Sequence, residues 1–196
     1  MQEFSQLRRG FKPIVLKQGN EKELFFNGEL VQDEKGIIIP EGDGFINIGY
    51  SSKNHLSRML SNLYPYEIVF RDEKAKSIEG VLQAIKHSEP DVQKLVMQYS
   101  GLDAYHTRGS TGVDDWRSRQ SLSWKNQTMM RDSEQYQVFL DELFSAAFEN
   151  PLYAKAIKST GDKVLLHSVG NENPQETVLT RNEYESRINS LKEKEL

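Results

Sequence analysis

Residues 77–86 read SIEGVLQAIK, and this pattern predicts a short amphipathic helix. Four apolar residues recur at helical spacing, so they share one face of such a helix: Ile78, Val81, Leu82 and Ile85. Ser77 stands directly before them and is a typical N-cap residue. We therefore expect a helix over residues 77–87 whose apolar face packs on the rest of the chain.

The opposite face of this helix is polar. Glu79 falls in the first turn, near the positive end of the helix dipole, and Gln83 and Lys86 follow on the same stripe. The dipole and Lys86 both favour the ionised carboxylate. An ionised carboxylate suits the stabilisation of a cationic transition state or the orientation of a water molecule. Acidic residues are also common in first turns as helix-stabilising residues, so the spacing alone leaves a structural role open.

Further helices are expected around this segment. Pro90 opens a helix that Gly101 ends, and its buried face is predicted to carry Val92, Leu95, Val96 and Tyr99. The widest apolar stripe lies in residues 134–149, with Ser133 as the cap. Another helix is predicted over residues 151–158.

The C-terminal end of the chain carries a capping box. Thr180 is followed three residues later by Glu183, which predicts the start of a last helix. Residues 106–121 are mostly polar and contain glycines and aspartates, so we expect a long loop, and loops of this length are often functional.

The first 50 residues have the pattern of short strands. Apolar runs alternate with turn signals that contain glycine; the runs are 14–16, 24–26, 37–39 and 45–48. Further strands are expected at residues 66–71 and 163–167. Together these features predict an α+β protein, with a β-rich N-terminal extension over residues 1–45 and a mainly helical domain with a small β-sheet over residues 46–196.

Composition narrows the classes of function. The chain has 196 residues, 37% hydrophobic and 28% charged, which is enough for a real core. Its net charge of −4 argues against non-specific binding of nucleic acid, which needs a basic surface. The absence of cysteine excludes disulfides and thiol chemistry. No apolar run is long enough for a membrane helix and no secretory signal is recognised, so we expect no membrane partner and a cytoplasmic location.

Metal and phosphate motifs are weak. The four histidines, His55, His87, His106 and His167, are widely separated, so no metal site and no cofactor is predicted. The run Gly-Ser-Thr-Gly at 109–112 lacks the lysine of a P-loop.

Four short segments carry a resemblance to a known family. Residues 60–65 (LSNLYP) and 77–86 resemble the LSNFYP and S-x-E-x-x-x-Q-A-x-K segments of the NADAR family, the NAD- and ADP-ribose-associated, YbiA-like proteins. Residues 148–152 (FENPL) and 160–166 (TGDKVLL) resemble its F-x-x-N-x-x-L and TGD-x-x-L segments. The order and the approximate distances agree over residues 46–170.

The resemblance implies an N-glycosidase. Members of this family cleave N-glycosidic bonds in nucleotide-like metabolites and in ADP-ribosylated guanine, so nucleic acid is expected only as the carrier of a modified base. The essential glutamate of the family falls on Glu79, with Lys86 also in the catalytic group. The family's pocket aromatic falls on Trp124 in preference to Trp116, because Met129-Met130 follows Trp124 at the family's spacing. The expected substrate-binding residues are Asn62, Tyr64, Gln83, Trp124, Arg108 and Asp162. Arg117, Arg119 and Lys125 also lie in or beside the polar loop, where they are candidates for holding phosphates.

The chain departs from the family after its TGD strand. The family has a carboxylate and then a D-x-x-W-G element, whereas residues 167–174 read HSVGNENP, with Glu172 as the candidate substitute for the aspartate. This departure supports a second hypothesis, a catalytically degenerate module that binds ADP-ribose or a protein partner. A third hypothesis is a purely structural or interaction protein that uses residues 1–45 as its contact surface.

Overall fold

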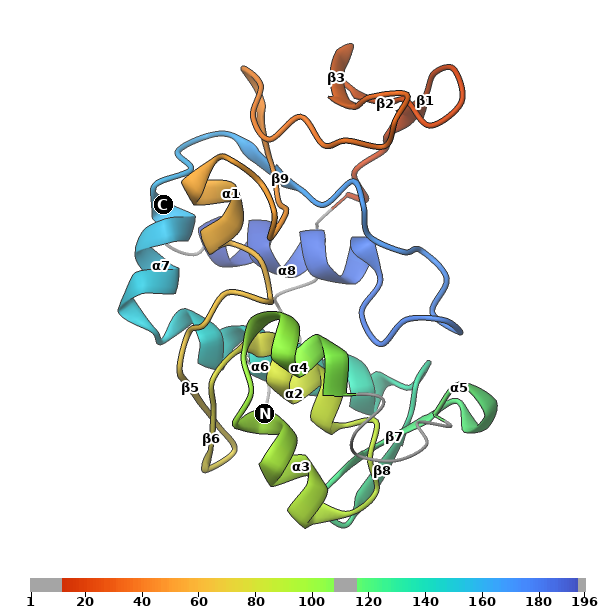
Figure 1. The fold of residues 1–196 in the computed structure, drawn as a ribbon, viewed down its shortest axis with the longest axis vertical. Coiled ribbons are helices and arrows are strands. Elements are labelled where there is room, and N and C mark those ends of the chain that lie inside the picture. Colours follow the sequence, from red (N-terminus) through yellow and green to blue (C-terminus); the bar gives the residue numbers. More distant parts are fainter. Residues whose placement is uncertain (1–11, 108–115, 194–196) are drawn as a thin grey trace.

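The computed structural model describes residues 12–107 and 116–193, and its elements confirm the α+β class (Figure 1). The helices are α1 (His55–Met59), α2 (Ile78–Ala84), α3 (Pro90–Met97), α4 (Gly101–His106), α5 (Trp116–Arg119), α6 (Glu134–Phe148), α7 (Pro151–Lys158) and α8 (Arg181–Glu193). The strands are β1 (Lys17–Gln18), β2 (Leu24–Phe26), β3 (Glu29–Gln32), β4 (Phe45–Asn47), β5 (Ile68–Phe70), β6 (Glu73–Ala75), β7 (Ser121–Trp124), β8 (Gln127–Met130) and β9 (Val164–Leu166). Among the described residues, no helix has the length and apolar character that a membrane crossing needs.

The N-terminal strands form an antiparallel sheet in the order β1-β2-β3, at the top of Figure 1. Asn27 and Gly28 adopt φ values of 50° and 87°, the left-handed geometry of a tight hairpin turn between β2 and β3. Two expected strands are wrong: residues 14–16 lie outside β1, and the run 37–39 makes only a single bridge, through Ile38. The division of the chain at residue 45 stays a prediction.

Strands β4 and β9 pair in parallel although they lie more than 100 residues apart in the chain. Asn47, in β4, is fully buried, and its side chain hydrogen-bonds β3 and the chain just after β9. Its Nδ2 donates to the Val31 carbonyl at 2.7 Å and to Ser168 Oγ at 2.9 Å, while its Oδ1 accepts from the Ser168 amide at 3.1 Å. The chain that leaves β9 is therefore fixed in place at Ser168.

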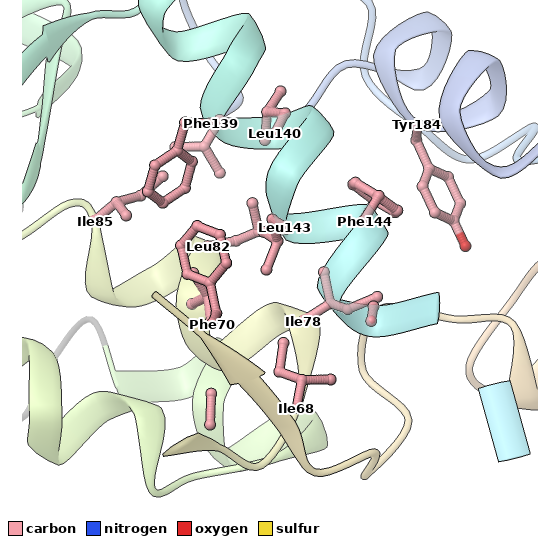
Figure 2. Close-up of a cluster of buried hydrophobic side chains, with 14 of the residues drawn as sticks. Ile68, Phe70, Ile78, Leu82, Ile85, Phe139, Leu140, Leu143, Phe144 and Tyr184 are labelled. Atoms are coloured by element: carbon pink, nitrogen blue, oxygen red, sulfur yellow. The ribbon is translucent and has the colours of Figure 1, made fainter. Parts of the chain in front are cut away.

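The main core lies where α2, β5 and α6 meet (Figure 2). Figure 2 shows the apolar face of α2, formed by Ile78, Leu82 and Ile85, directed toward side chains of α6 and β5 such as Leu143 and Phe70. These side chains are almost completely buried, so their removal from water stabilises the fold. Because the apolar face of α2 is turned into the core, its polar stripe must face the other way.

Helix α3 and the segment after it correct two expectations. Leu95 and Tyr99 are exposed rather than buried, because Gln93 occupies the inner face of α3. The Gln93 amide donates to the carbonyls of His87 and Ser123, at 2.6 and 2.9 Å, and accepts from the Lys125 amide.

The expected loop over 106–121 is also interrupted. Helix α4 continues to His106, α5 begins at Trp116, and β7 begins at Ser121; residues 108–115 lie outside the described part of the chain. The hairpin of β7 and β8 has no counterpart in the sequence expectations. Its turn contains Lys125 at φ 53°, a residue type that signals no turn.

Candidate functional site

Glu79 stands in the first turn of α2, whose start is fixed from two sides. Ser77 Oγ accepts a hydrogen bond from the Gly80 amide at 3.0 Å, which confirms the predicted N-cap. The Glu79 amide donates to the carbonyl of Asn62 at 3.0 Å, so the segment around residue 62 lies directly against this turn. Glu79 is half-buried.

The polar stripe of α2 is a hydrogen-bonded series. Lys86 Nζ donates to Gln83 Oε1 at 2.7 Å, and Gln83 Nε2 donates to Glu79 Oε1 at 2.6 Å. A lysine ammonium can only donate, so Gln83 must turn its oxygen to Lys86 and its amide hydrogens to Glu79. Lys86 is 6% exposed and Gln83 is 4% exposed, which strengthens both interactions. The positive charge of Lys86 thereby stabilises negative charge on Glu79.

Glu79 lines a cleft of about 450 Å³, within the size range of small-molecule sites. The loop after α1, the polar stripe of α2, helices α4 and α5, the chain after β9 and helix α8 all contribute to its wall. The residues that line the cleft include Asn62, Glu79, Gln83, Lys86, Trp116, Arg117, His167, Gly170, Glu176 and Thr177.

One wall of the cleft is formed by residues 169–171 and 176–179, which belong to an irregular segment that long side chains hold in place. Arg117 donates through Nε and Nη2 to the carbonyl of Glu176, at 3.1 and 2.9 Å. Gln120 Nε2 donates to the carbonyl of Gln175 at 3.1 Å, and Arg131 Nε donates to the carbonyl of Thr177 at 2.9 Å. The wall is therefore fixed, and two nitrogens of Arg117 serve it rather than a ligand phosphate.

His167 lines the cleft, although no role for it was predicted from the sequence. Its Nδ1 lies 3.0 Å from the carbonyl of Ile48, and its backbone amide donates to Glu185 Oε1 at 2.6 Å. A carbonyl can only accept, so Nδ1 carries the hydrogen. Burial lowers the pKa of His167 and Arg181 lowers it further, against the opposing effect of the Ile48 carbonyl. The ring is thus neutral near pH 7.

A sequence signal for His167 existed. It directly follows the TGD strand, at the position where the resembled family carries a carboxylate. In this chain the carboxylate of Glu185, from α8, binds the backbone of that position instead. Burial raises the pKa of Glu185 to about 7.

Asn62 lines the cleft and has one unsatisfied polar atom beneath its surface. Its Oδ1 is buried and has no hydrogen-bond partner among the described residues. A buried acceptor without a donor costs stability, typically about 1–3 kcal/mol. Because this oxygen is closed off from solvent, a molecule bound in the cleft does not reach it unless the side chain rearranges.

The structure brings four of the expected site residues together: Asn62, Glu79, Gln83 and Lys86. Two further expected residues lie apart from them. Tyr64 packs on Tyr66, with ring centroids 4.7 Å apart, and Asp162 lines a separate cavity of about 500 Å³ beside Lys12 and Lys192. Arg108 lies outside the described residues.

The expected aromatic of the cleft requires a correction. Trp124 ends β7 and points into the core, where it makes edge contacts with Phe70 and Phe139. Trp116 lies at the wall of the cleft but is also fully buried, so neither tryptophan presents a ring face to a bound molecule. The spacing to Met129-Met130 was a poor guide because β7 and β8 form a hairpin that turns Trp124 inward.

Other expected ligand groups are engaged elsewhere. Lys125 forms an ion pair with Glu73 at 3.0 Å. Glu172 pairs with Arg181 and is absent from the lining of the cleft, so it does not take the place of the family's aspartate there. Across residues 12–107 and 116–193, no group of three or more potential metal ligands is found.

Comparisons with known proteins give three findings. The family model described as "Bacteriophage protein GP30.3" matches residues 54–193. An Enterobacteria phage T4 protein described as "Uncharacterized 17.1 kDa protein in Gp30-rIII intergenic region" is 27% identical over 137 residues, which cover 68% of this chain and 88% of that protein. The NMR structure of the E. coli protein YbiA matches with a TM-score of 0.49 and 15% identity, over 79% of this chain and 86% of that chain.

Proposed function

The chain belongs to the bacteriophage protein GP30.3 family, and we propose that it is an N-glycosidase that hydrolyses a ribosyl C–N bond. Its substrate is a nucleotide-like metabolite or an ADP-ribosylated base. The observation that carries the proposal is the position of Glu79: half-buried on the wall of a cleft of about 450 Å³, and hydrogen-bonded to Gln83, which Lys86 orients.

Cleavage of a ribosyl C–N bond builds positive charge on the sugar, as in glycoside hydrolysis generally. A carboxylate beside the anomeric carbon stabilises that charge and takes a proton from the attacking water. The water oxygen forms a bond to the anomeric carbon, the C–N bond breaks, and its electron pair leaves with the base nitrogen. The proton taken from water is returned to that nitrogen, so the products are a free sugar and a protonated base.

Lys86 acts through Gln83 and is therefore a positioning residue in this scheme. Its ammonium fixes the orientation of the Gln83 amide, which directs N–H toward Glu79. Without that constraint the amide can rotate and present its oxygen to the carboxylate, which would repel it.

The variant Glu79→Gln tests the proposal. It keeps the shape of the side chain and removes its negative charge, so release of reducing sugar should fall at least about 100-fold, as expected when a group that stabilises a charged transition state is lost. Glu67→Gln is the matched control. Glu67 is exposed, and its ion pair with Lys74 is long at 3.9 Å. Wild-type rates in Glu79→Gln across a panel of ribonucleotides and ADP-ribosylated guanine would overturn the mechanism.

A catalytically degenerate binding module is the second candidate, favoured by the absence of Glu172 from the cleft. Calorimetric titration with ADP-ribose beside the hydrolysis assay separates the two candidates. Binding without turnover by the wild-type protein favours the module.

A further inference from the structure

The cleft contains a fixed hydrogen-bond acceptor that the hydrolytic scheme does not use. His167 lies on the wall of the cleft, and its Nδ1 is committed to the Ile48 carbonyl. In a neutral imidazole the second nitrogen is then an acceptor. No partner for Nε2 is found within residues 12–107 and 116–193, so this lone pair is left for a bound molecule.

The imidazole is held rigidly. The backbone amide of His167 is bound by Glu185, and the ring makes an edge contact with Tyr184 at a centroid distance of 5.2 Å. Gly170 closes over the ring: a Cβ built there would lie 2.9 Å from His167 Cδ2, which is too close for any side chain. The backbone hydrogen bond, the edge contact with Tyr184 and the missing side chain at residue 170 together fix the direction of Nε2.

Glu79 supplies a second acceptor group on the wall of the same cleft, through its carboxylate. A ligand that binds both His167 Nε2 and Glu79 carries at least two hydrogen-bond donors, which is the property of a sugar with adjacent hydroxyl groups.

We propose that His167 is a specificity-determining residue, whose Nε2 accepts a hydrogen bond from a donor of the ligand and selects ribose over 2-deoxyribose. This inference rests on the proposed function in placing the sugar beside Glu79. The alternative source of the donor is an exocyclic amine of the base, and the ligand pairs below separate the two. A site that hydrogen-bonds a hydroxyl group rejects the analogue without it, because the acceptor is then left unpaired.

The first test uses the wild-type protein. Ribose 5-phosphate and 2-deoxyribose 5-phosphate are titrated while the ring nitrogens of His167 are observed by NMR. We expect Nδ1 protonated and Nε2 unprotonated in the free protein, a change at Nε2 on addition of the ribose compound, and about tenfold weaker binding of the deoxy compound. GMP and inosine 5′-phosphate form the second pair; discrimination in this pair alone assigns the donor to the base amine and overturns the selection of ribose.

The second test uses His167→Phe, which keeps a ring and removes the acceptor, and His167→Gln, which restores an acceptor at a similar reach. Loss of the ribose preference in the first variant and its partial return in the second are expected, with folding checked by thermal unfolding. An unchanged preference in a folded His167→Phe variant, or a protonated Nε2 in the free protein, would overturn the inference. Binding of ribose 5-phosphate at His167, together with no hydrolysis of any ribonucleotide or of ADP-ribosylated guanine, would instead remove the proposed hydrolysis and leave the acceptor site standing.

Discussion

Replacement of Glu183 by Gln should cost far more stability than its exchange of one oxygen for nitrogen suggests. Glu183 receives donors on both oxygens: Arg131 Nη1 and Gln137 Nε2 reach Oε1 at 2.9 and 2.6 Å, while Arg131 Nη2 and the Thr180 amide reach Oε2 at 2.6 and 2.7 Å. A glutamine side chain must place an NH₂ group against at least two of these donors. Arg131 is only 2% exposed, so its charge would be left buried and uncompensated.

Breaking a buried ion pair by removal of one partner costs about 3–5 kcal/mol. For a chain of this size, about 2–4 °C of melting temperature is lost per kcal/mol, so Glu183→Gln should melt roughly 6–20 °C below the wild type. The assay is thermal unfolding followed by circular dichroism at pH 7. Glu172→Gln is the matched control, because the Glu172 side chain is 50% exposed and its pair with Arg181 should contribute at most about 1 kcal/mol.

The result that would refute this reasoning is equal melting of the two variants. It would mean that Arg131 finds other acceptors, and that the network does not hold the cleft wall at Thr177 as its geometry indicates. The double variant Arg131→Met with Glu183→Gln should recover part of the loss, since it removes the uncompensated charge.

Three further outcomes are expected. Burial alone would raise the pKa of Glu183, but its hydrogen-bond donors, Arg131 first, hold that pKa below the ordinary value of 4.5. The contribution of Glu183 to folding stability is therefore present above pH 4.5 and is lost on acidification. The unfolding free energies of the wild type and Glu183→Gln should become equal in acid titrations at low pH. Lys86→Met should lower kcat about tenfold or more with little change in KM, because Lys86 acts on Glu79 through the Gln83 amide. Steady-state kinetics measure both constants, and an unchanged kcat would exclude the positioning role of Lys86. Trp124→Leu should lower the melting temperature without changing the affinity for ADP-ribose, because Trp124 packs on Phe70 and Phe139 in the core. A calorimetric titration that finds weaker binding would contradict this placement.

Local patterns predicted local structure well in this chain. The cap at Ser77, the helices opened by Pro90 and Pro151, and the capping box of Thr180 and Glu183 depend on neighbours within a few residues, and all four are confirmed. The shared face of Glu79, Gln83 and Lys86 also follows from helical spacing alone.

The opposite wall of the cleft could not be predicted in this way. His167 is placed by the parallel pairing of β4 with β9 and by the bond of its ring to Ile48, 119 residues earlier in the chain. The wall at Glu176 and Thr177 depends on Arg117 and Arg131, which spacing alone would assign to a solvated surface. Such contacts are set by tertiary packing, and a single sequence contains no periodic signal for them.

The most direct measurement is a crystal structure of the protein with ADP-ribose bound. We expect the anomeric carbon of the terminal ribose to lie about 3–4 Å from a carboxylate oxygen of Glu79, the distance from which an attacking water can be held. Density for the ligand only in the cavity beside Asp162, or with its terminal ribose directed away from Glu79, would contradict the assignment of the cleft as the place of reaction.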